Sequence, residues 1–587
     1  MIRLLRCLTT SLRAIDLRKE ALLFGLFLAV ALGFQWLGGV YQSEFGGHPD
    51  EPVHYVTGVF VRDAIARLPV CMAERSLKPL ASFVSKDTPG GFYDHYPKVA
   101  LGNWPPMFYL LQAVWTLLFS TSRTAVLLLM SVVAAFLAWL LCRALHHQVG
   151  HGAALLGGIL LLSLPLVQEH TALVMTEIPV AIFCLAAALC WGRFLDRGGA
   201  CDTVLFGLLA SAAILTKGSG MALAWAVPVS VLLTGRFDRL KALAFWLPVP
   251  IVLVLAGPWT WKFREAARAG WEFDQPLWAF TSDALVYYPR KLFLAVGLAL
   301  FLLALIGCLG PLRQSSLRQF RSGKWAMAAG LLFSVVLQQL IIPCGYEPRH
   351  LLPGLPPLLM FAVAGARMVI VWLKARNVAP QKAAALVWGI ALAAYGLESL
   401  QVYHKGYAGF SNVAKSLLAD PANSSARFLV SSDATGEGIF ISEVVMRDKR
   451  PGHTIRRGSK ALASSTWSGS GYRAKFDNAQ EVIAFLEQES IEVLVLDESV
   501  PAGMRVAHHE LLKQTVAQHP ERFTSLGKHD MKRAGVLIPE AIRVYRFNSG
   551  ASRAAPLAVC GRAPGEEPAA RVALRPHEEP RQARIRR

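Results

Sequence analysis

Two adjacent carboxylates, Asp50 and Glu51, follow the first long apolar run of the chain, in the segment GGHPDEPVHYVTGVF that begins at Gly46. His54 and Tyr55 come directly behind them. A carboxylate beside polar side chains can take a proton from a substrate hydroxyl, which is general base catalysis. The alternative is structural, because acids at the start of a helix cap its free N–H groups and complement its dipole. The rest of the sequence is needed to distinguish a reactive site from a helix cap.

Cationic, imidazole and aromatic side chains that could contact a substrate occur farther along the chain: Lys98, Lys217, Tyr346, Arg349 and His350. An arginine guanidinium can bind two phosphate oxygens at once, and at a lipid–water boundary such a pair is poorly screened. For Arg349 and Lys217 the structural alternative is a long side chain that reaches from the apolar region to the interface. Tyr346 has the same alternative as an aromatic interface anchor.

The elements that must position these residues are membrane-spanning helices. Hydrophobic residues are 54% of the 587 residues and charged residues only 17%, and the apolar residues come in long blocks, which is typical of a polytopic membrane protein. Only a helix satisfies its own backbone hydrogen bonds in lipid, so we predict a polytopic α-helical membrane fold for residues 1–402. We expect about eleven spans, which begin near residues 21, 123, 152, 178, 203, 219, 241, 291, 325, 350 and 383. The shorter aromatic stretch 105–120 is expected to lie in the interface.

Positive charge orients this set of spans. With a cytoplasmic N-terminus, the inside segments hold about eighteen Lys and Arg residues, against about six in the short outside loops and about six in the long first loop, 41–122. This bias predicts that the polar segments 46–103, 168–179, 262–290 and 344–350 lie outside. The N-terminal apolar run lacks a small-residue cleavage site and is expected to stay as an anchor. The net charge of +20 then reflects topology and a basic tail, so nucleic-acid binding is not expected.

The chain changes character after about residue 402. The segments ARFLVSS, IEVLVLDES and IRVYRF have the composition or alternation of strands, and DNAQEVIAFLEQES has helical spacing. We predict a soluble periplasmic α/β domain over residues 403–548, followed by a disordered basic tail, 549–587. The nine cysteines include no CxxC pair, although Cys71 and Cys344 could meet outside.

Five motifs occur in an order that resembles a known enzyme family. They are the DE pair at residue 50, GNWPPMFYL at 102–110, LVMTEIPVAIF at 173–183, LTKG at 215–218 and RHLLPGLPPLL at 349–359. Together they resemble the GT-C class of membrane glycosyltransferases, specifically family 39, which includes the protein O-mannosyltransferases and the aminoarabinose transferases that modify lipid A. The resemblance implies transfer of a sugar from a polyprenyl phosphate to a lipid, glycan or protein acceptor. It also implies an integral protein of the bacterial inner membrane whose site faces the periplasm.

The resemblance assigns catalytic roles by position. Asp50 matches the first acid of the family's DE pair and is expected to be the general base, while Glu51 is expected to orient neighbouring groups or the acceptor. Glu177 matches the second acidic position, where relatives often carry Asp, and is expected to help hold the acceptor or sugar. For Glu177 a helix cap is the alternative. A single base predicts a single displacement, and therefore inversion at the sugar carbon.

Donor binding is expected to involve cationic and aromatic side chains around the acids: Arg349, His350, Lys217, Lys98, Tyr346, His54 and Tyr55. The chain departs from the family pattern at Trp104, because the aminoarabinose transferases carry a Lys directly before the Pro-Pro. Lys98 is the candidate that could replace it. Relatives in family 39 generally use no metal, so no cofactor is expected, although two carboxylates near a phosphate could also hold a divalent cation.

Two functions from other classes compete with this hypothesis. A transporter or lipid flippase would need ionisable residues or broken helices near the middle of its spans, whereas here nearly all charges are expected at span ends or in loops. A non-catalytic scaffold would work through its C-terminal domain, and the DE pair and Arg349 would then be dispensable.

Overall fold

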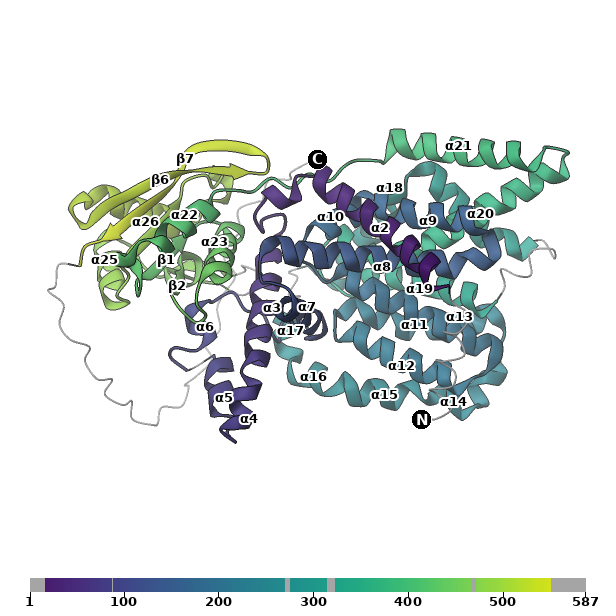
Figure 1. The fold of residues 1–587 in the computed structure, drawn as a ribbon, viewed down its shortest axis with the longest axis horizontal. Helices are drawn as coiled ribbons and strands as arrows, with labels where there is room; N and C mark the ends of the chain where they lie inside the picture. Colours follow the sequence, from purple (N-terminus) through teal and green to yellow (C-terminus); the bar gives the residue numbers. More distant parts are fainter. Residues whose placement is uncertain (1–15, 87, 270–274, 314–321, 466–470, 550–587) are drawn as a thin grey trace. The chain divides into compact units, whose positions relative to one another are not determined.

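The computed structural model describes residues 16–549 except 87, 270–274, 314–321 and 466–470, and most of these residues are helical (Figure 1). Six helical segments in the described part are long and apolar enough to cross a membrane. They are α2 (Leu17–Leu37), α8 (Arg123–Val149), α11 (Glu177–Arg197), α18 (Leu277–Arg313), α19 (Gly323–Ile341), and η5 (Pro348–Gly354) continued by α20 (Leu355–Ala375). The pair α9 (His151–Ser163) and α10 (Pro165–Ala172) is bent by 63° and would be a seventh. The predicted polytopic helical fold is confirmed at this level.

The predicted number of eleven spans is not confirmed. The other apolar stretches form helices that fall short of this criterion: α12 (Ala200–Ile214), α13 (Ala222–Thr234), α14 (Leu243–Trp246), α15 (Pro248–Leu255) and α21 (Pro380–Glu398). Proline explains one of these interruptions, because Pro248 separates α14 from α15 and cannot donate a backbone hydrogen bond. The aromatic stretch expected at the interface forms α7 (Met107–Leu118), whose 12 residues are too few to cross a core of about 30 Å.

The segment 262–290, expected to be a loop, is largely helical where it is described. It holds all of α17 (Arg264–Ala269), which follows α16 (Gly257–Lys262), and the start of α18. Helix α18 begins at Leu277, before the predicted span near residue 291. Two tyrosines hold this first part of the helix, because the hydroxyls of Tyr287 and Tyr288 donate to the carbonyls of Tyr346 and Gly345, each at 2.7 Å. Helix α18 then breaks at Gly297, where φ is +77°, a backbone conformation that favours glycine.

Helices α18 and α20 approach each other so closely that their backbones touch. A Cβ atom on Gly307 would collide with the carbonyl oxygen of Phe361, and one on Gly365 would collide with that of Leu303. Small residues allow this close packing between helices in lipid. The two glycines therefore set the spacing between α18 and α20, the helix that follows the segment carrying Arg349.

The first polar segment folds into short helices: α3 (Glu51–Ala66), α4 (Leu68–Ala73), α5 (Lys78–Val84) and α6 (Phe92–His95). Asp50 stands at the N-cap position of α3, but its side chain makes no capping hydrogen bond. Pro52 in the first turn suits a helix start, because the missing N–H has no partner there in any case. The cap alternative for Asp50 is therefore not supported by its geometry.

The C-terminal region contains a five-stranded sheet with the order β2-β1-β5-β7-β6. Its strands are β1 (Arg427–Ser431), β2 (Thr454–Arg457), β5 (Val493–Asp497), β6 (Phe523–Arg533) and β7 (Val536–Phe547). The main helices of the region are α22 (Phe410–Ala419), α23 (Ala434–Arg447), α25 (Ala479–Gln488) and α26 (Ala507–Gln518). Strand β1 is parallel to β2 and β5, whereas β7 is antiparallel to β5 and β6. The strands and the helix predicted from the sequence are all present, while the predicted tail lies outside the described residues beyond 549.

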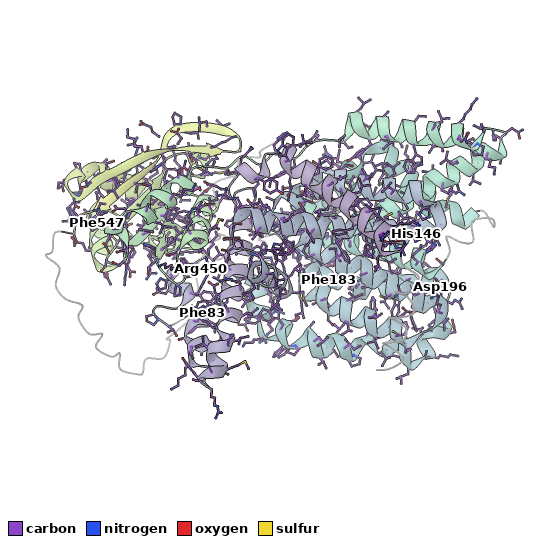
Figure 2. The ribbon with its side chains drawn as sticks, in the orientation of Figure 1. Phe83, His146, Phe183, Asp196, Arg450 and Phe547 are labelled. Carbon is purple, nitrogen blue, oxygen red and sulfur yellow. The ribbon has the colours of Figure 1, made fainter. Side chains whose placement is uncertain are left out.

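Buried ion pairs tie this region to the first polar segment. Arg450, labelled in Figure 2, donates from Nε to Asp63 in α3 at 2.7 Å. Glu443 in α23 is fully buried and pairs with Arg123 at the start of α8. Separating the partners of such a pair is unfavourable, because each would be left as an uncompensated buried charge. The two ion pairs therefore hold the sheet region against α3, which begins at Glu51, and against the start of α8.

The suggested meeting of two cysteines outside the membrane is wrong. Cys71 and Cys344 are both free thiols. Cys71 is buried in α4, while the thiol of Cys344 lies 3.2 Å from Oε1 of Gln339 and 3.5 Å from Nδ1 of His350. The Cys71 thiol is thus buried within its own segment, and the Cys344 thiol is bonded to side chains near it in sequence.

Candidate active site

A cavity of about 660 Å³ brings together several of the predicted side chains. Its volume is in the range of small-molecule sites. Its polar lining comes from segments far apart in the sequence and includes His48, Asp50, Lys217, Gln338, Gln339, Cys344, Glu347, Arg349 and His350. Its aromatic lining includes Trp104, Trp259 and Phe263, and Ala434 of α23 also contributes. We call this space the Asp50 cavity.

Asp50 faces Arg349 across the Asp50 cavity. Nη1 of Arg349 donates to Oδ2 of Asp50 at 3.0 Å, and the backbone N–H of Asp50 donates to Nδ1 of His48 at 3.1 Å. Burial is the largest single influence on the pKa of Asp50 and would raise it, but the neighbouring groups, Arg349 first among them, together lower the pKa below the usual value. Asp50 is therefore a carboxylate, ready to accept a proton, at neutral pH.

Glu177 lies behind the cationic side chains and not on the wall of the cavity. Its Oε1 accepts a hydrogen bond from Nζ of Lys217 at 2.5 Å, and Nε of Arg349 lies 3.7 Å from the same oxygen. Glu347 pairs with Arg349 from another side. The Glu177 side chain is only 1% exposed, and the N-cap residue of α11 is Thr176, which makes no side-chain capping bond. Glu177 therefore positions two cations, and its predicted contact with sugar or acceptor stays a prediction.

Glu51 points away from the Asp50 cavity. Its Oε1 accepts from Nζ of Lys405 at 2.5 Å and from the backbone of Val174 at 3.2 Å, and its Oε2 accepts from Gly47 at 3.1 Å. The residue is completely buried, and burial raises the pKa of its carboxyl despite the ammonium beside it. Neighbouring acids in the sequence thus have opposite surroundings, because the first helical turn sends their side chains in different directions.

Lys98 is buried beside the cavity wall. Its Nζ donates to the carbonyl of Ala434 at 3.0 Å, and Ala434 lines the cavity. Burial and the nearby Arg457 lower the pKa of Lys98 to about 7. Its ammonium therefore links α23 to the first polar segment, and its binding of the donor stays a prediction.

The aromatic candidates support the cavity from outside its lining. Nδ1 of His54 lies 2.9 Å from the hydroxyl of Tyr109, and its ring meets Trp104 edge-on with centroids 5.1 Å apart. Tyr55 is completely buried and donates to the carbonyl of Thr121 at 2.7 Å. The structure does not bring these two side chains to the cavity surface.

Tyr346 also lies outside the cavity lining. Its ring stacks on Phe280 with centroids 5.0 Å apart, and its hydroxyl donates to Oε1 of Gln275 at 3.2 Å. The residue connects the segment before Arg349 to α18. This placement agrees better with an anchoring role than with a contact to phosphate.

Two titratable residues that bracket the pair of Asp50 and Arg349 are among the polar lining residues that sequence reasoning missed. His48 lies two positions before Asp50, and Glu347 two positions before Arg349. Burial and Arg349 lower the pKa of His48 to about 4, so its ring is neutral at pH 7. Both residues were inside the polar segments that the sequence singled out, but only the fold shows that they face the same space. Within the described residues, no group of His, Cys, Asp and Glu is placed to hold a metal ion.

Comparison with known proteins identifies folds that resemble this one. Residues 103–261 match the family described as dolichyl-phosphate-mannose-protein mannosyltransferase. ArnT from Cupriavidus metallidurans in the apo state has 14% sequence identity and a TM-score of 0.50, with 89% of this chain and 97% of that chain covered. The apo oligosaccharyltransferase of Archaeoglobus fulgidus has 12% identity and a TM-score of 0.50, covering 81% of this chain and 69% of that one. No curated protein sequence matches the chain.

A further structure is that of AglB from Archaeoglobus fulgidus in complex with an inhibitory peptide and a dolichol-phosphate, with 12% identity, a TM-score of 0.50, and 91% and 75% of the two chains covered. At these identities the likeness concerns the fold. The chain therefore has the fold of the GT-C membrane glycosyltransferases, and the resemblance seen in the sequence is confirmed.

Proposed function

We propose that this protein transfers a glycosyl group from a polyprenyl-phosphate sugar to an acceptor hydroxyl. The observation that carries the proposal is the pair formed by Asp50 and Arg349, 3.0 Å apart in one cavity. One is a candidate base for the acceptor, and the other is a candidate cation for the departing phosphate. The matched mannosyltransferase segment and the dolichol-phosphate in the AglB complex support a lipid-linked donor.

In the proposed reaction, the acceptor oxygen attacks the sugar carbon that carries the phosphate. Asp50 takes the acceptor's proton as the new C–O bond forms, and the bond to the phosphate oxygen breaks with its electron pair. The negative charge that develops on the phosphate is stabilised by Arg349 and Lys217. Attack opposite to the leaving phosphate inverts the configuration at this carbon.

The ion pair between Asp50 and Arg349 is compatible with both roles. A guanidinium has five N–H donors, so Arg349 can keep Asp50 ionised through Nη1 while its other donors bind phosphate. Glu177 holds Lys217 and lies close to Arg349, which fixes the two cations before the donor arrives. Positions fixed in advance lower the barrier, because no reorganisation is needed when charge develops.

The aromatic part of the Asp50 cavity provides surfaces for the rest of the donor. Trp104, Trp259 and Phe263 line it, and aromatic faces pack well against sugar rings and isoprenoid chains. Trp104 stands where aminoarabinose transferases carry Lys, and Lys98 is committed to the carbonyl of Ala434. We infer that Arg349 and Lys217 are the main phosphate ligands in this chain. The donor sugar, whether a hexose or a pentose, and a lipid, glycan or protein acceptor are to be found by experiment.

We also propose that the Asp50 cavity faces the periplasm of a bacterial inner membrane, as the distribution of Lys and Arg predicts. The C-terminal region, residues 403–548, would then lie on the same side, because Ala434 of α23 lines this cavity. A role for this region in gathering the acceptor follows from that position.

The experiment that tests the proposal is transfer of label from a panel of radiolabelled polyprenyl-phosphate sugars. Membranes with the protein should form a labelled product with at least one donor, whereas membranes without it should not. Reconstituted vesicles distinguish transfer from transport, because a transporter or flippase would move the label across the bilayer without changing its chemical form. Movement without any product over the whole panel would contradict the proposal.

A further inference from the structure

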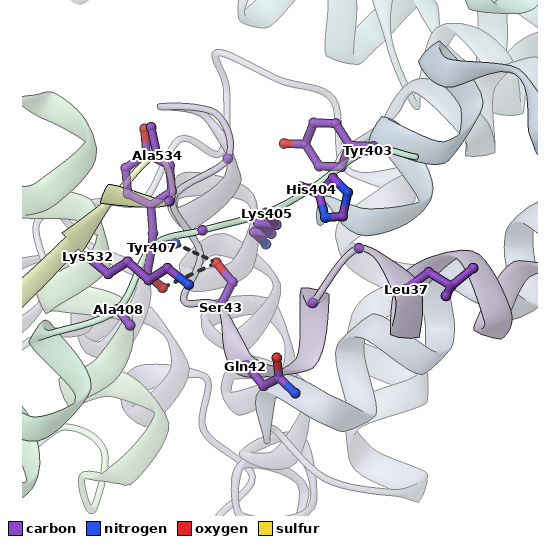
Figure 3. Close-up of a pocket in the computed structure, with 15 residues that line it drawn as sticks. Leu37, Gln42, Ser43, Tyr403, His404, Lys405, Tyr407, Ala408, Lys532 and Ala534 are labelled. Atoms are coloured by element: carbon purple, nitrogen blue, oxygen red, sulfur yellow. Dashed lines mark hydrogen bonds between the residues drawn. The ribbon is translucent and has the colours of Figure 1, made fainter. Parts of the chain in front are cut away.

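The chain between α21 and α22 contacts both the loop that precedes Asp50 and the side chain of Glu51. Residues 403–408, which we call the linker, contact the loop before Asp50 at several points (Figure 3). The linker's Lys405 N–H donates to the carbonyl of Gly38 at 3.0 Å, and the N–H of Glu44 donates to the carbonyl of Tyr407 at 2.6 Å. The hydroxyl of Ser43 both accepts from the Tyr407 N–H at 2.9 Å and lies 3.2 Å from its carbonyl. The linker is therefore bonded to the end of α2 at Lys405 and to the loop at Tyr407.

The two glycines before Asp50 leave no space between the loop and the linker. A Cβ on Gly46 would lie 2.6 Å from the ring of Tyr407, and one on Gly47 would lie 2.8 Å from the hydroxyl of Tyr403. Contacts this short do not occur for real Cβ atoms. The loop that carries Asp50 is thus packed closely against the linker.

A buried ion pair fixes this contact. Lys405 and Glu51 both have completely buried side chains, and Nζ of Lys405 lies 2.5 Å from Oε1 of Glu51. Nζ also lies 3.3 Å from the carbonyl of Ala172. Glu51 in turn accepts from the backbones of Gly47 and Val174. One carboxylate therefore joins the linker, the Asp50 loop and the turn that leads to Glu177.

We propose that Lys405 is a positioning residue of the glycosyltransferase site, which holds Asp50 in place through Glu51. The inference rests on the proposed function and extends it, because it makes the catalytic geometry depend on the linker to the C-terminal region. Lys405 does not line the Asp50 cavity. Its effect should therefore appear in the rate of the chemical step and in the mobility of the loop, and not in the binding of donor phosphate.

A second cavity supplies the matched control. It has a volume of about 520 Å³ and lies between the end of α2, the linker and the β6–β7 turn. Lys405 and Lys532 both line it (Figure 3). Lys532 is exposed and has no ion pair among those of the described residues. Lys532→Met removes a positive charge from the same cavity and leaves the pair with Glu51 intact.

The test measures backbone hydrogen exchange in the segment 46–51 of the full-length protein in lipid nanodiscs. Lys405→Met should accelerate exchange at Gly47 and Asp50 by about 10-fold or more, while Lys532→Met should leave it unchanged. The double variant Glu51→Gln/Lys405→Met contains no unpaired buried charge and is expected to fold. It should show the same faster exchange. Unchanged exchange in the double variant would overturn the proposal.

Kinetics give the second readout. Lys405→Met and the double variant should lower kcat by about 10-fold or more, with KM for the polyprenyl-phosphate sugar within about 2-fold of wild type. An equal loss in Lys532→Met, or a loss confined to KM, would contradict a positioning role. If the wild type transfers no sugar, the proposed function fails, but the exchange rates still decide whether Lys405 holds the loop.

Discussion

The ion pair of Asp50 and Arg349 determines whether the proposed base is ionised. The guanidinium lowers the pKa of Asp50 against the effect of burial, so the base of the wild type stays ionised down to an acidic pH. Because the base must be deprotonated to act, kcat/KM should hold as the pH falls and should decline only below the usual range of an aspartate.

Arg349→Gln removes this counter-charge. Burial then dominates and the pKa of Asp50 rises, so the decline in kcat/KM should begin at a higher pH than in the wild type. The plateau should also fall by about 100-fold, because the leaving phosphate loses a preorganised donor. A pH–rate profile of the purified enzyme measures both effects. Arg349→Lys keeps the charge and is the control: if its acid limb moves as far as that of Arg349→Gln, the counter-charge is not the cause.

Glu177 is predicted to matter for stability as well as for activity. Glu177→Gln leaves Lys217 and Arg349 without their shared buried carboxylate, which should cost about 3 kcal/mol. Thermal unfolding in detergent should show a lower Tm. Glu177→Asp retains the charge and should lose much less stability. Equal losses in both variants would show that side-chain length, and not charge, is what the site requires.

The residues of the site could be predicted only in part. The ordered motifs indicated that Asp50, Lys217, Arg349 and His350 belong together, and they line one cavity. The direction in which Glu51, His54 and Tyr55 point could not be predicted, because it depends on the rotation of α3 against its neighbours. The partner of Glu51, Lys405, is distant in the sequence and carries no motif of its own.

At the scale of elements, the close crossing of α18 and α20 predicts that alanine at Gly365 lowers the stability of the protein. Gly365→Ala should destabilise the protein by about 1–3 kcal/mol, because the new Cβ collides with the Leu303 carbonyl. Gly389→Ala in α21 is the matched control, since nothing lies within 4 Å of its Cβ position. There the higher helix propensity of alanine should be neutral or stabilising by up to about 1 kcal/mol. Thermal unfolding of both variants decides, and a tolerated Gly365→Ala would contradict the close packing.

Elements with a regular local pattern were predicted well. Strands β1 and β5 are continuous apolar runs between turn residues, and their composition was sufficient to locate them. The count of spans was harder, because an apolar stretch shows where a helix can be buried but not whether proline or a bend interrupts it. Helices α14 and α15 illustrate this, since together they cover one predicted span. The early start of α18 depends on tyrosine contacts with a distant segment, which no local pattern contains.

The arrangement of the whole molecule in the membrane is a prediction that labelling can test. Single cysteines at Asp477, in the sheet region, and at Asp238, between α13 and α14, would be introduced into a variant that lacks the nine native cysteines. A membrane-impermeant maleimide should label position 477 in intact cells and position 238 only after permeabilisation. The reverse pattern would place the Asp50 cavity on the cytoplasmic side, where the proposed donor would have to face the other leaflet.

The central claim is that Asp50 is the base of a glycosyl transfer from a polyprenyl-phosphate donor. The most direct test compares the rate of label transfer by the wild type and by Asp50→Asn at matched expression, with the exposed Asp477→Asn as control. If Asp50 is the base, Asp50→Asn should lose about 2 kcal/mol or more of transition-state stabilisation, which is about 30-fold in rate, while the control should transfer like the wild type. Equal transfer by Asp50→Asn and the wild type would show that Asp50 is not the base.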